Sequence, residues 1–263
     1  MDSFMHRIGL HGKAIIPAVL GYGCNVPAVM ATRIMESRRD RFIAALVSTM
    51  VPCAARMTII FGLTGYYLGA NAAIAIYLLN LVVIALSGMI LSRLMPEISP
   101  GILMEIPSYQ VPRLRGALLK TWFRLKDFII IAWPLLIVGS GVLALAEYYN
   151  LNELINGLLS PLTGILGLPR QVGMTLIFGI LRKELSMLML FQALGTTAIN
   201  TVMSQGQILV FTIFVVFYIP CVATLGVLSK QLRAKATAAI VVFTFLLAVA
   251  LGLVARMVAV VIW

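Results

Sequence analysis

The stretch Gly21-Tyr22-Gly23-Cys24-Asn25-Val26-Pro27 lies inside an apolar segment of about residues 14–31. Glycine is conformationally loose and proline lacks a backbone N–H group, so this combination interrupts a helix. The interruption places Cys24 and Asn25 at the break. Taken alone, the motif is better explained by a simple helix kink in which Cys24 packs as a small apolar side chain.

The other two cysteines of the chain also follow prolines, in Pro52-Cys53-Ala54-Ala55 and Pro220-Cys221-Val222-Ala223. Each proline removes the hydrogen bond to the carbonyl one turn earlier, so we expect a free carbonyl beside a thiol. Thiolates bind soft or borderline metals, whereas oxygen ligands bind hard ones. The repeated arrangement predicts a mixed metal site that suits Fe²⁺ and does not exclude Mn²⁺, Co²⁺ or Zn²⁺.

The composition places these motifs in a membrane. The 263 residues are 61% hydrophobic and 11% charged, whereas soluble domains carry roughly a quarter of charged residues. Such a chain must be solvated mainly by lipid. The net charge of +11 fits basic cytoplasmic loops better than nucleic-acid binding, and three widely spaced cysteines are no disulfide framework. The start of the chain does not have the pattern of a cleavable signal peptide.

The predicted fold is all-α: a polytopic transmembrane helix bundle with broken or re-entrant segments in an inverted repeat. Loops at 32–41, 93–126 and 229–235 are rich in Lys and Arg and are predicted to be cytoplasmic, while 147–169 and 195–207 carry neither and should be external. The apolar segments fall at about 14–31, 42–68, 70–94, 128–146, 172–194, 208–228 and 236–263, and a basic amphipathic stretch at 113–126 should lie in the membrane interface.

This orientation makes the segment at 172–194 begin and end on the same side. It is either a hairpin that turns near residues 182–184, or a broken span preceded by a half-span at 154–168. Irregular backbone at membrane depth must line a cavity or be buried in protein. Interrupted segments in two inverted halves indicate a transporter's binding site. We divide the chain into a first gate repeat (1–126), a linking helix with external connector (127–170) and a second gate repeat (171–263).

Glu184 is the only carboxylate well inside an apolar segment. Ionisable groups at that depth usually mark ion pathways, although Arg182 and Lys183 could simply neutralise Glu184 at a hairpin tip. The chain has no Gly-x-x-x-x-Gly-Lys-[Ser/Thr] loop for ATP or GTP. We therefore expect a transporter and not an enzyme.

Five stretches, in order, resemble the membrane domain of the ferrous iron transport protein B (FeoB) family: residues 21–27, 52–56, 103–109, 179–184 and 218–224. The resemblance implies Fe²⁺ uptake across a prokaryotic cytoplasmic (inner) membrane. It assigns metal binding to Cys24, Cys53, Cys221 and Glu184, with Asn25 beside them. The gate backbone then comprises Gly21, Gly23, Pro27, Pro52, Gly179 and Pro220.

Full members of that family also carry an N-terminal GTP-binding domain, which this sequence lacks. The resemblance implies Fe²⁺ as transported substrate with no permanently bound cofactor, and as partners the lipid bilayer, a separate GTP-binding chain, a small cytoplasmic accessory protein and further copies of the chain. Two alternatives stay open: a carrier of an organic solute such as a nucleoside, and a non-transporting subunit that scaffolds a GTPase or senses metal through its thiols.

Overall fold

The computed structural model describes residues 12–35, 37–95, 114–148, 152–194, 199 and 202–262, and within these ranges every regular element is a helix. The stretch at 103–109 that carries one of the family resemblances lies outside them. Helical stretches long and apolar enough to cross a membrane are found in the described part at Arg38–Tyr67, Ala70–Leu94, Gln205–Gln231 and Ala234–Val260. The prediction of an all-α, multi-pass membrane protein is confirmed.

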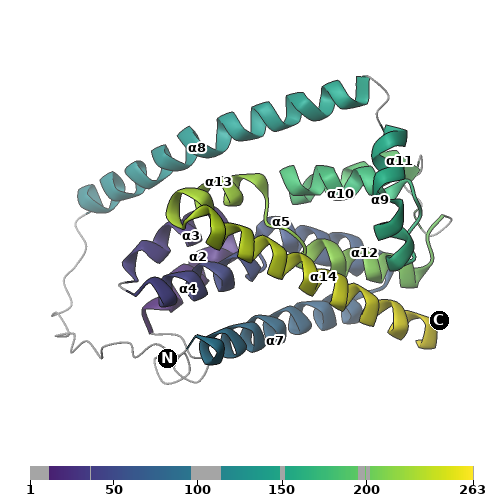
Figure 1. Ribbon diagram of the computed structural model, residues 1–263, viewed down its shortest axis with the longest axis horizontal. Coiled ribbons are helices and arrows are strands. Elements are labelled where there is room, and N and C mark those ends of the chain that lie inside the picture. Colours follow the sequence, from purple (N-terminus) through teal and green to yellow (C-terminus); the bar gives the residue numbers. More distant parts are fainter. Residues whose placement is uncertain are drawn as a thin grey trace.

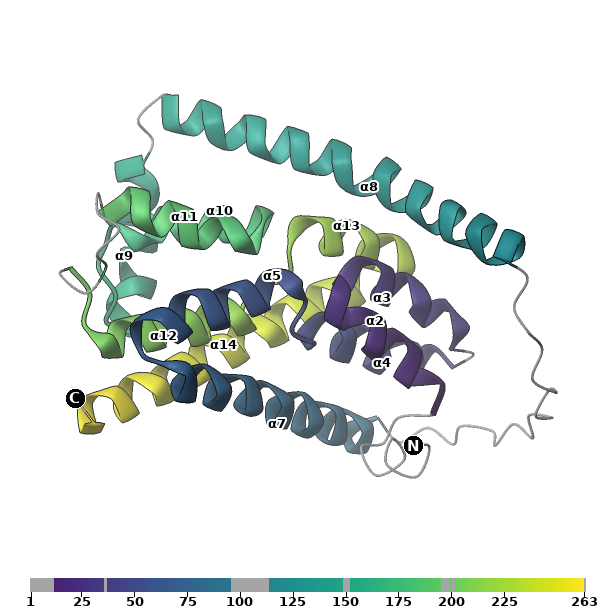
Figure 2. The ribbon, with the colours of Figure 1, turned by 180° about the vertical axis from the view of Figure 1, so that it is seen from behind.

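The first interrupted segment is a helical hairpin. Helices α2 (Ile15–Gly23) and α3 (Asn25–Ala31) are joined by Cys24 alone, whose backbone is extended with φ −153° and ψ 134°. The two helices lie side by side (Figures 1 and 2). Pro27 is tolerated because it sits in the first turn of α3, where backbone N–H groups have no partner within the helix.

The second interrupted segment has the same form. Helices α10 (Val172–Leu181) and α11 (Lys183–Leu194) are joined by Arg182, whose backbone is extended with φ −144° and ψ 115°. Of the two arrangements considered for this segment, the hairpin that turns at Arg182 is therefore the one observed. The preceding connector forms a separate short helix, α9 (Asn152–Leu166).

In both proline-cysteine segments the helix is broken completely. The sequence predicts instead a helix that contains a proline in each segment. Helix α4 (Arg38–Met50) ends before Pro52, and the chain continues as α5 (Ala54–Met57), the π-helix η3 (Thr58–Thr64) and α6 (Gly65–Tyr67). Helix α12 (Gln205–Phe217) likewise ends before Pro220, and α13 (Val222–Gln231) follows. Proline forces the residue before it into an extended conformation, which separates the two halves of each helix.

Three long helices surround this centre. Helices α7 (Ala70–Leu94) and α14 (Ala234–Ile262) lie on one side of the broken helices in Figure 1, and α8 (Leu114–Tyr148) lies on the other. Only 28% of the apolar windows of α7 and α14 is buried, against 72% for the two broken helices. Helices α7 and α14 therefore leave most of their apolar surface uncovered by protein and available to lipid.

Helix α8 corrects one prediction. A separate interfacial helix at 113–126 and a span at 128–146 were expected, but the structure has one continuous helix of 35 residues. No glycine or proline lies between residues 117 and 133 to end the first part. Helix α8 passes over α3, α13 and α10 (Figure 1).

Polar contacts gather the loops at two ends of the molecule. At one end Arg33 Nε and Arg41 Nη2 both donate to Gln231 Oε1, at 2.8 and 2.7 Å, and Arg39 donates to the carbonyl of Ser92. At the other end Gln207 donates to the carbonyl of Gly167. Of the segments predicted to be cytoplasmic, 32–41 and 229–235 thus meet at one end, next to Ser92, and the two predicted to be external meet at the other.

Candidate functional site

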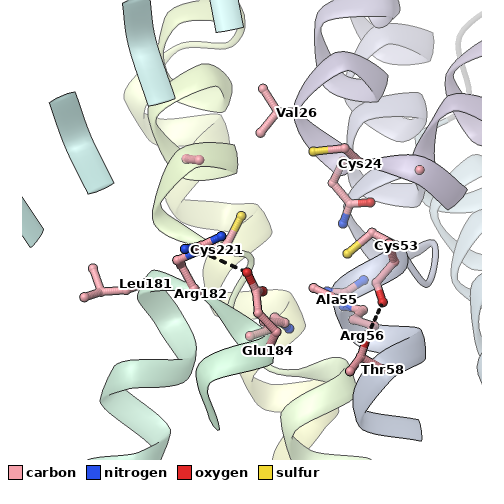
Figure 3. Close-up of a pocket in the computed structure, with 15 residues that line it drawn as sticks. Cys24, Val26, Cys53, Ala55, Arg56, Thr58, Leu181, Arg182, Glu184 and Cys221 are labelled. Atoms are coloured by element: carbon pink, nitrogen blue, oxygen red, sulfur yellow. Dashed lines mark hydrogen bonds and ion pairs between the residues drawn. The ribbon is translucent and has the colours of Figure 1, made fainter. Parts of the chain in front are cut away.

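A cavity of about 430 Å³ lies where the tips of both hairpins meet the breaks of both proline-cysteine helices (Figure 3). Its walls come from the first half of the chain (residues 23–26, 53–56 and 58) and from the second half (residues 181–184, 221 and 223). Every predicted metal-binding residue lines it: Cys24, Asn25, Cys53, Glu184 and Cys221.

The three cysteines are positioned in the same way. Each is the residue that precedes the first turn of a helix: Cys24 before α3, Cys53 before α5 and Cys221 before α13. All are free and partly buried. Cys24 and Cys53 lie on one side of the cavity, and Cys221 lies on the other together with Glu184 (Figure 3). Because helix N-termini carry partial positive charge, they favour negatively charged groups inside this cavity.

Asn25 presents an oxygen with no partner. The side chain is only 5% exposed, and its Nδ2 donates to the carbonyl of Thr49 at 3.0 Å. Its Oδ1 is buried and accepts no hydrogen bond from the described residues. An unsatisfied buried acceptor costs about 1–3 kcal/mol. Asn25 therefore places an acceptor without a hydrogen bond in the wall of the cavity.

Glu184 forms an ion pair with its neighbour at the hairpin tip. Arg182 Nε lies 3.0 Å from Glu184 Oε1, and the two side chains are 53% and 37% exposed. The predicted neutralisation of Glu184 is therefore present with Arg182 but not with Lys183, which points elsewhere. Ion pairs this exposed contribute only about 0–1 kcal/mol, so Glu184 can exchange Arg182 for another cation.

Several carbonyls at the helix breaks are already occupied, whereas a free carbonyl is expected from the sequence beside each proline. Arg56 Nη1 donates to the carbonyls of Thr49 and Val51, at 2.6 and 3.1 Å, at the end of α4. Lys183 Nζ donates to the carbonyl of Val215 at 3.0 Å, at the end of α12. Carbonyls exposed by a helix break need partners in a medium without water, and these two buried cations supply them.

Sequence reasoning missed Arg56 and treated Lys183 only as a neighbour of Glu184. A usable signal existed for Arg56, because it follows Pro52 by one helical turn and can therefore reach back to the end of α4. For Lys183 no local signal existed, since its acceptors lie more than 30 positions along the chain.

The predicted gate-backbone residues have unequal roles. Gly23 lines the cavity. Gly21 is buried against Val51, where a Cβ atom would lie 3.0 Å from the valine Cβ. Gly179 has no room for a Cβ atom, which would meet Ser186 Oγ and Tyr218 Oη. The prolines at 27, 52 and 220 shape the breaks without lining the cavity.

The cysteines share a cavity but do not form a closed metal centre. Among the described residues, no three His, Cys, Asp or Glu side chains are close enough together to hold one ion. Joint coordination by the two sides therefore requires the two walls of the cavity to approach each other.

The fold and the cavity define a multi-pass membrane protein with two opposed helical hairpins that meet at a central, thiol-lined cavity. A family described as "Nucleoside recognition" (Gate) matches residues 1–67 and 129–235, more than half of the chain. A second family, "Ferrous iron transport protein B C terminus", matches residues 73–124. The chain therefore belongs to the Gate family and corresponds in sequence to the membrane portion of ferrous iron transport protein B.

Similar curated proteins carry the name Fe(2+) transporter FeoB. The one from Methanocaldococcus jannaschii is 30% identical over 96% of this chain and 42% of its own length. Those from Staphylococcus aureus and Synechocystis sp. are 29% identical, over 88% and 93% of this chain and 38% and 43% of their own lengths. The chain thus spans about two fifths of these relatives. No solved structure matches it.

Proposed function

We propose that this chain is the pore-forming membrane portion of a ferrous iron transporter in a prokaryotic inner membrane, and that it acts as a transporter and not as an enzyme. The observation that carries the proposal is the meeting of Cys24, Cys53, Cys221, Asn25 and Glu184 at one cavity, although they come from four separate elements. The names of the similar proteins support Fe²⁺ as the cargo.

In this proposal Fe²⁺ exchanges water for protein ligands at the hairpin tips. Glu184 leaves Arg182 and attracts the ion, Asn25 Oδ1 supplies a neutral oxygen, and the cysteine thiolates form the stronger bonds. Since Cys24 and Cys53 face Cys221 across the cavity, binding draws the two walls of the cavity together. Release follows when the walls separate, so each ligand set must bind loosely enough for the ion to leave.

The test is Fe²⁺ uptake by cells that lack other iron transporters and express the variant with Cys24, Cys53 and Cys221 all changed to Ser. We expect uptake to fall by a factor of about 10 or more, because serine hydroxyls are poor ligands for borderline metals. Ala55→Ser is the matched control, since it also adds a hydroxyl to the cavity wall without removing a thiol. Unchanged uptake by the triple variant at equal expression would refute the thiol ligands.

A carrier of an organic solute is the second candidate. A cavity of about 430 Å³ is far larger than a bare metal ion, and it lies within the size range of roughly 300–1,000 Å³ typical of small-molecule sites. The description of the Gate family points the same way. Thermal stabilisation of the purified protein by a nucleoside, but not by Co²⁺ or Fe²⁺, would favour this candidate.

The proposal also includes a separate GTP-binding chain as a partner, together with a small accessory protein. Reconstitution of this chain alone in liposomes tests that part. Fe²⁺ flux that appears only after a GTP-binding partner is added would support it, whereas full flux from the chain alone would argue that no partner is required.

A further inference from the structure

Two arginines, Arg33 and Arg41, share one neutral acceptor at the end of the molecule predicted to be cytoplasmic. Arg33 Nε and Arg41 Nη2 donate to the same oxygen, Gln231 Oε1, at 2.8 and 2.7 Å. The two nitrogens can therefore lie no farther apart than the sum of these distances. Because arginine stays protonated in proteins, the two guanidinium groups of this arginine pair repel each other.

The arginine pair is not neutralised within the described part of the chain. The ion pair found there at this end, Arg39–Asp40, does not include either arginine of the pair. An amide oxygen accepts hydrogen bonds but carries no net charge. The segments 32–41 and 229–235 together contain seven Lys and Arg residues, against Glu36 and Asp40 as acids. The pair therefore lies in a strongly positive region.

The arginine pair keeps donors for a further partner. A guanidinium carries five N–H groups, and only one side-chain nitrogen of each arginine donates to a described residue. Arg33 is exposed and Arg41 is half-buried, so an anion can reach the pair from outside the protein. Phosphate oxygens match the planar fork of a guanidinium, and a phosphate group has enough oxygens to accept from both arginines.

The arginine pair lies where membrane spans end. Gln231 is the last residue of the span Gln205–Gln231, and Arg41 lies near the start of the span Arg38–Tyr67. The apolar side chain of Ile34, next to Arg33 in the chain, is 36% exposed. Anionic lipids attract basic residues at this boundary, and their acyl chains can cover apolar side chains beside the phosphate. This position favours the phosphate of a lipid over a free phosphate ion.

We infer that Arg33, Arg41 and Gln231 form a binding site for the phosphate of an anionic phospholipid. Basic residues are common in cytoplasmic loops, but that tendency alone does not bring two arginines to one neutral acceptor. Gln231 holds the arginine pair in place, and the lipid phosphate supplies the negative charge. Since Gln231 and the arginine pair belong to different halves of the chain, the bound lipid joins the two halves. The inference does not depend on what passes through the cavity.

The test measures how tightly the purified full chain, in dodecyl maltoside micelles, binds dioleoyl phosphatidylglycerol, with dioleoyl phosphatidylcholine as the lipid without net charge. Native mass spectrometry counts the bound lipids. For the unaltered protein we expect phosphatidylglycerol to bind about 10-fold more tightly or more. Gln231→Glu keeps the size of the side chain but pairs a carboxylate with both arginines, so it should weaken phosphatidylglycerol binding by about 10-fold or more.

Lys235→Gln is the matched control. It lowers the charge of the same end by one unit, as Gln231→Glu does, but at an exposed position of α14 and without a carboxylate between the arginines. It should weaken phosphatidylglycerol binding by less than about 3-fold. Arg41→Gln is an independent variant that removes one charge of the pair and should weaken binding as Gln231→Glu does. The melting temperature of each lipid-free variant confirms that it is folded.

Three results would overturn the inference. The first is that the unaltered protein binds phosphatidylglycerol no more tightly than phosphatidylcholine, which would leave the arginine pair to an acidic segment of another protein. The second is that Gln231→Glu and Arg41→Gln weaken binding no more than Lys235→Gln, which would show a diffuse attraction to the whole basic end. The third is that inorganic phosphate, at the concentration of the lipid, displaces phosphatidylglycerol, which would make a free phosphate the ligand.

Discussion

Asn25 and Lys183 occupy corresponding positions in the two halves of the protein. Each is the first helical residue after the single extended residue at a hairpin tip. Asn25 Nδ2 donates to the carbonyl of Thr49 at the end of α4, and Lys183 Nζ donates to that of Val215 at the end of α12, both at 3.0 Å. Each hairpin tip is thereby attached to the broken helix that follows it in the chain.

Because Thr49 accepts from both Asn25 and Arg56, the two side chains should be energetically coupled. We expect Asn25→Ala and Arg56→Met to destabilise the protein together by about 1–3 kcal/mol more than the sum of the single changes, since only the double variant leaves the Thr49 carbonyl without a donor. Thermal unfolding of the purified variants measures this. Asn25→Ala combined with the distant Thr244→Val should be additive, and additivity in the first pair would contradict the shared acceptor.

Gly179→Ala should destabilise the second hairpin by about 1–3 kcal/mol, because the added methyl group would overlap Ser186 Oγ and Tyr218 Oη in a packed interior. Gly23→Ala is the matched control at the end of α2, since apart from its chain neighbours and its own helix backbone no described atom lies within 4 Å of the position that its methyl group would take. Melting temperatures of the two variants check the prediction. Equal melting temperatures would show that the contact around Gly179 relaxes freely.

Gln231→Ala should loosen the contact between the two halves at their basic end. The change removes the acceptor shared by Arg33 and Arg41. Polar contacts this exposed contribute little to stability, so the melting temperature should change by less than about 2 °C. Cys24 should nevertheless react faster with a maleimide added from that end. Gln171→Ala is the control and should leave the rate of the maleimide reaction unchanged, because the Gln171 side chain makes no capping hydrogen bond. If Gln231→Ala also leaves that rate unchanged, the contact between the two halves is incidental.

The sidedness of the two ends is open to direct labelling. In a chain whose own cysteines are replaced by serine, Val202→Cys should react with a membrane-impermeant maleimide in intact cells, because it is exposed at the end predicted to be external. Lys230→Cys should react only after the cells are permeabilised. The reverse pattern would invert the orientation of both hairpins.

The positions of glycine and proline in the chain predicted much of the candidate site. Glycine and proline act on the residues beside them, so the motifs were sufficient to place Cys24 at a break and Cys53 and Cys221 beside a helix-perturbing proline. Charge placement correctly grouped 32–41 with 229–235 and 147–169 with 195–207. It left open whether residues 172–194 form a hairpin, because a hairpin and a broken span share the same hydropathy.

The extent of α8 was not predictable from pattern alone. Its first part is amphipathic and its second part is apolar, which indicates two helices in different environments. Helix continuity depends on the absence of a breaking residue and not on hydropathy, and no such residue lies at the junction.

The sequence by itself determined that this protein crosses a membrane, that its three cysteines lie beside helix-perturbing prolines or glycines, and that such motifs recur in both halves of the chain. Only the tertiary structure decided what happens at those breaks: Arg56 and Lys183 occupy the carbonyls, while Asn25 keeps an unpaired oxygen at the cavity. The physical reason is that a break creates unsatisfied backbone groups locally, but their partners depend on which side chains the fold brings within about 3 Å of them.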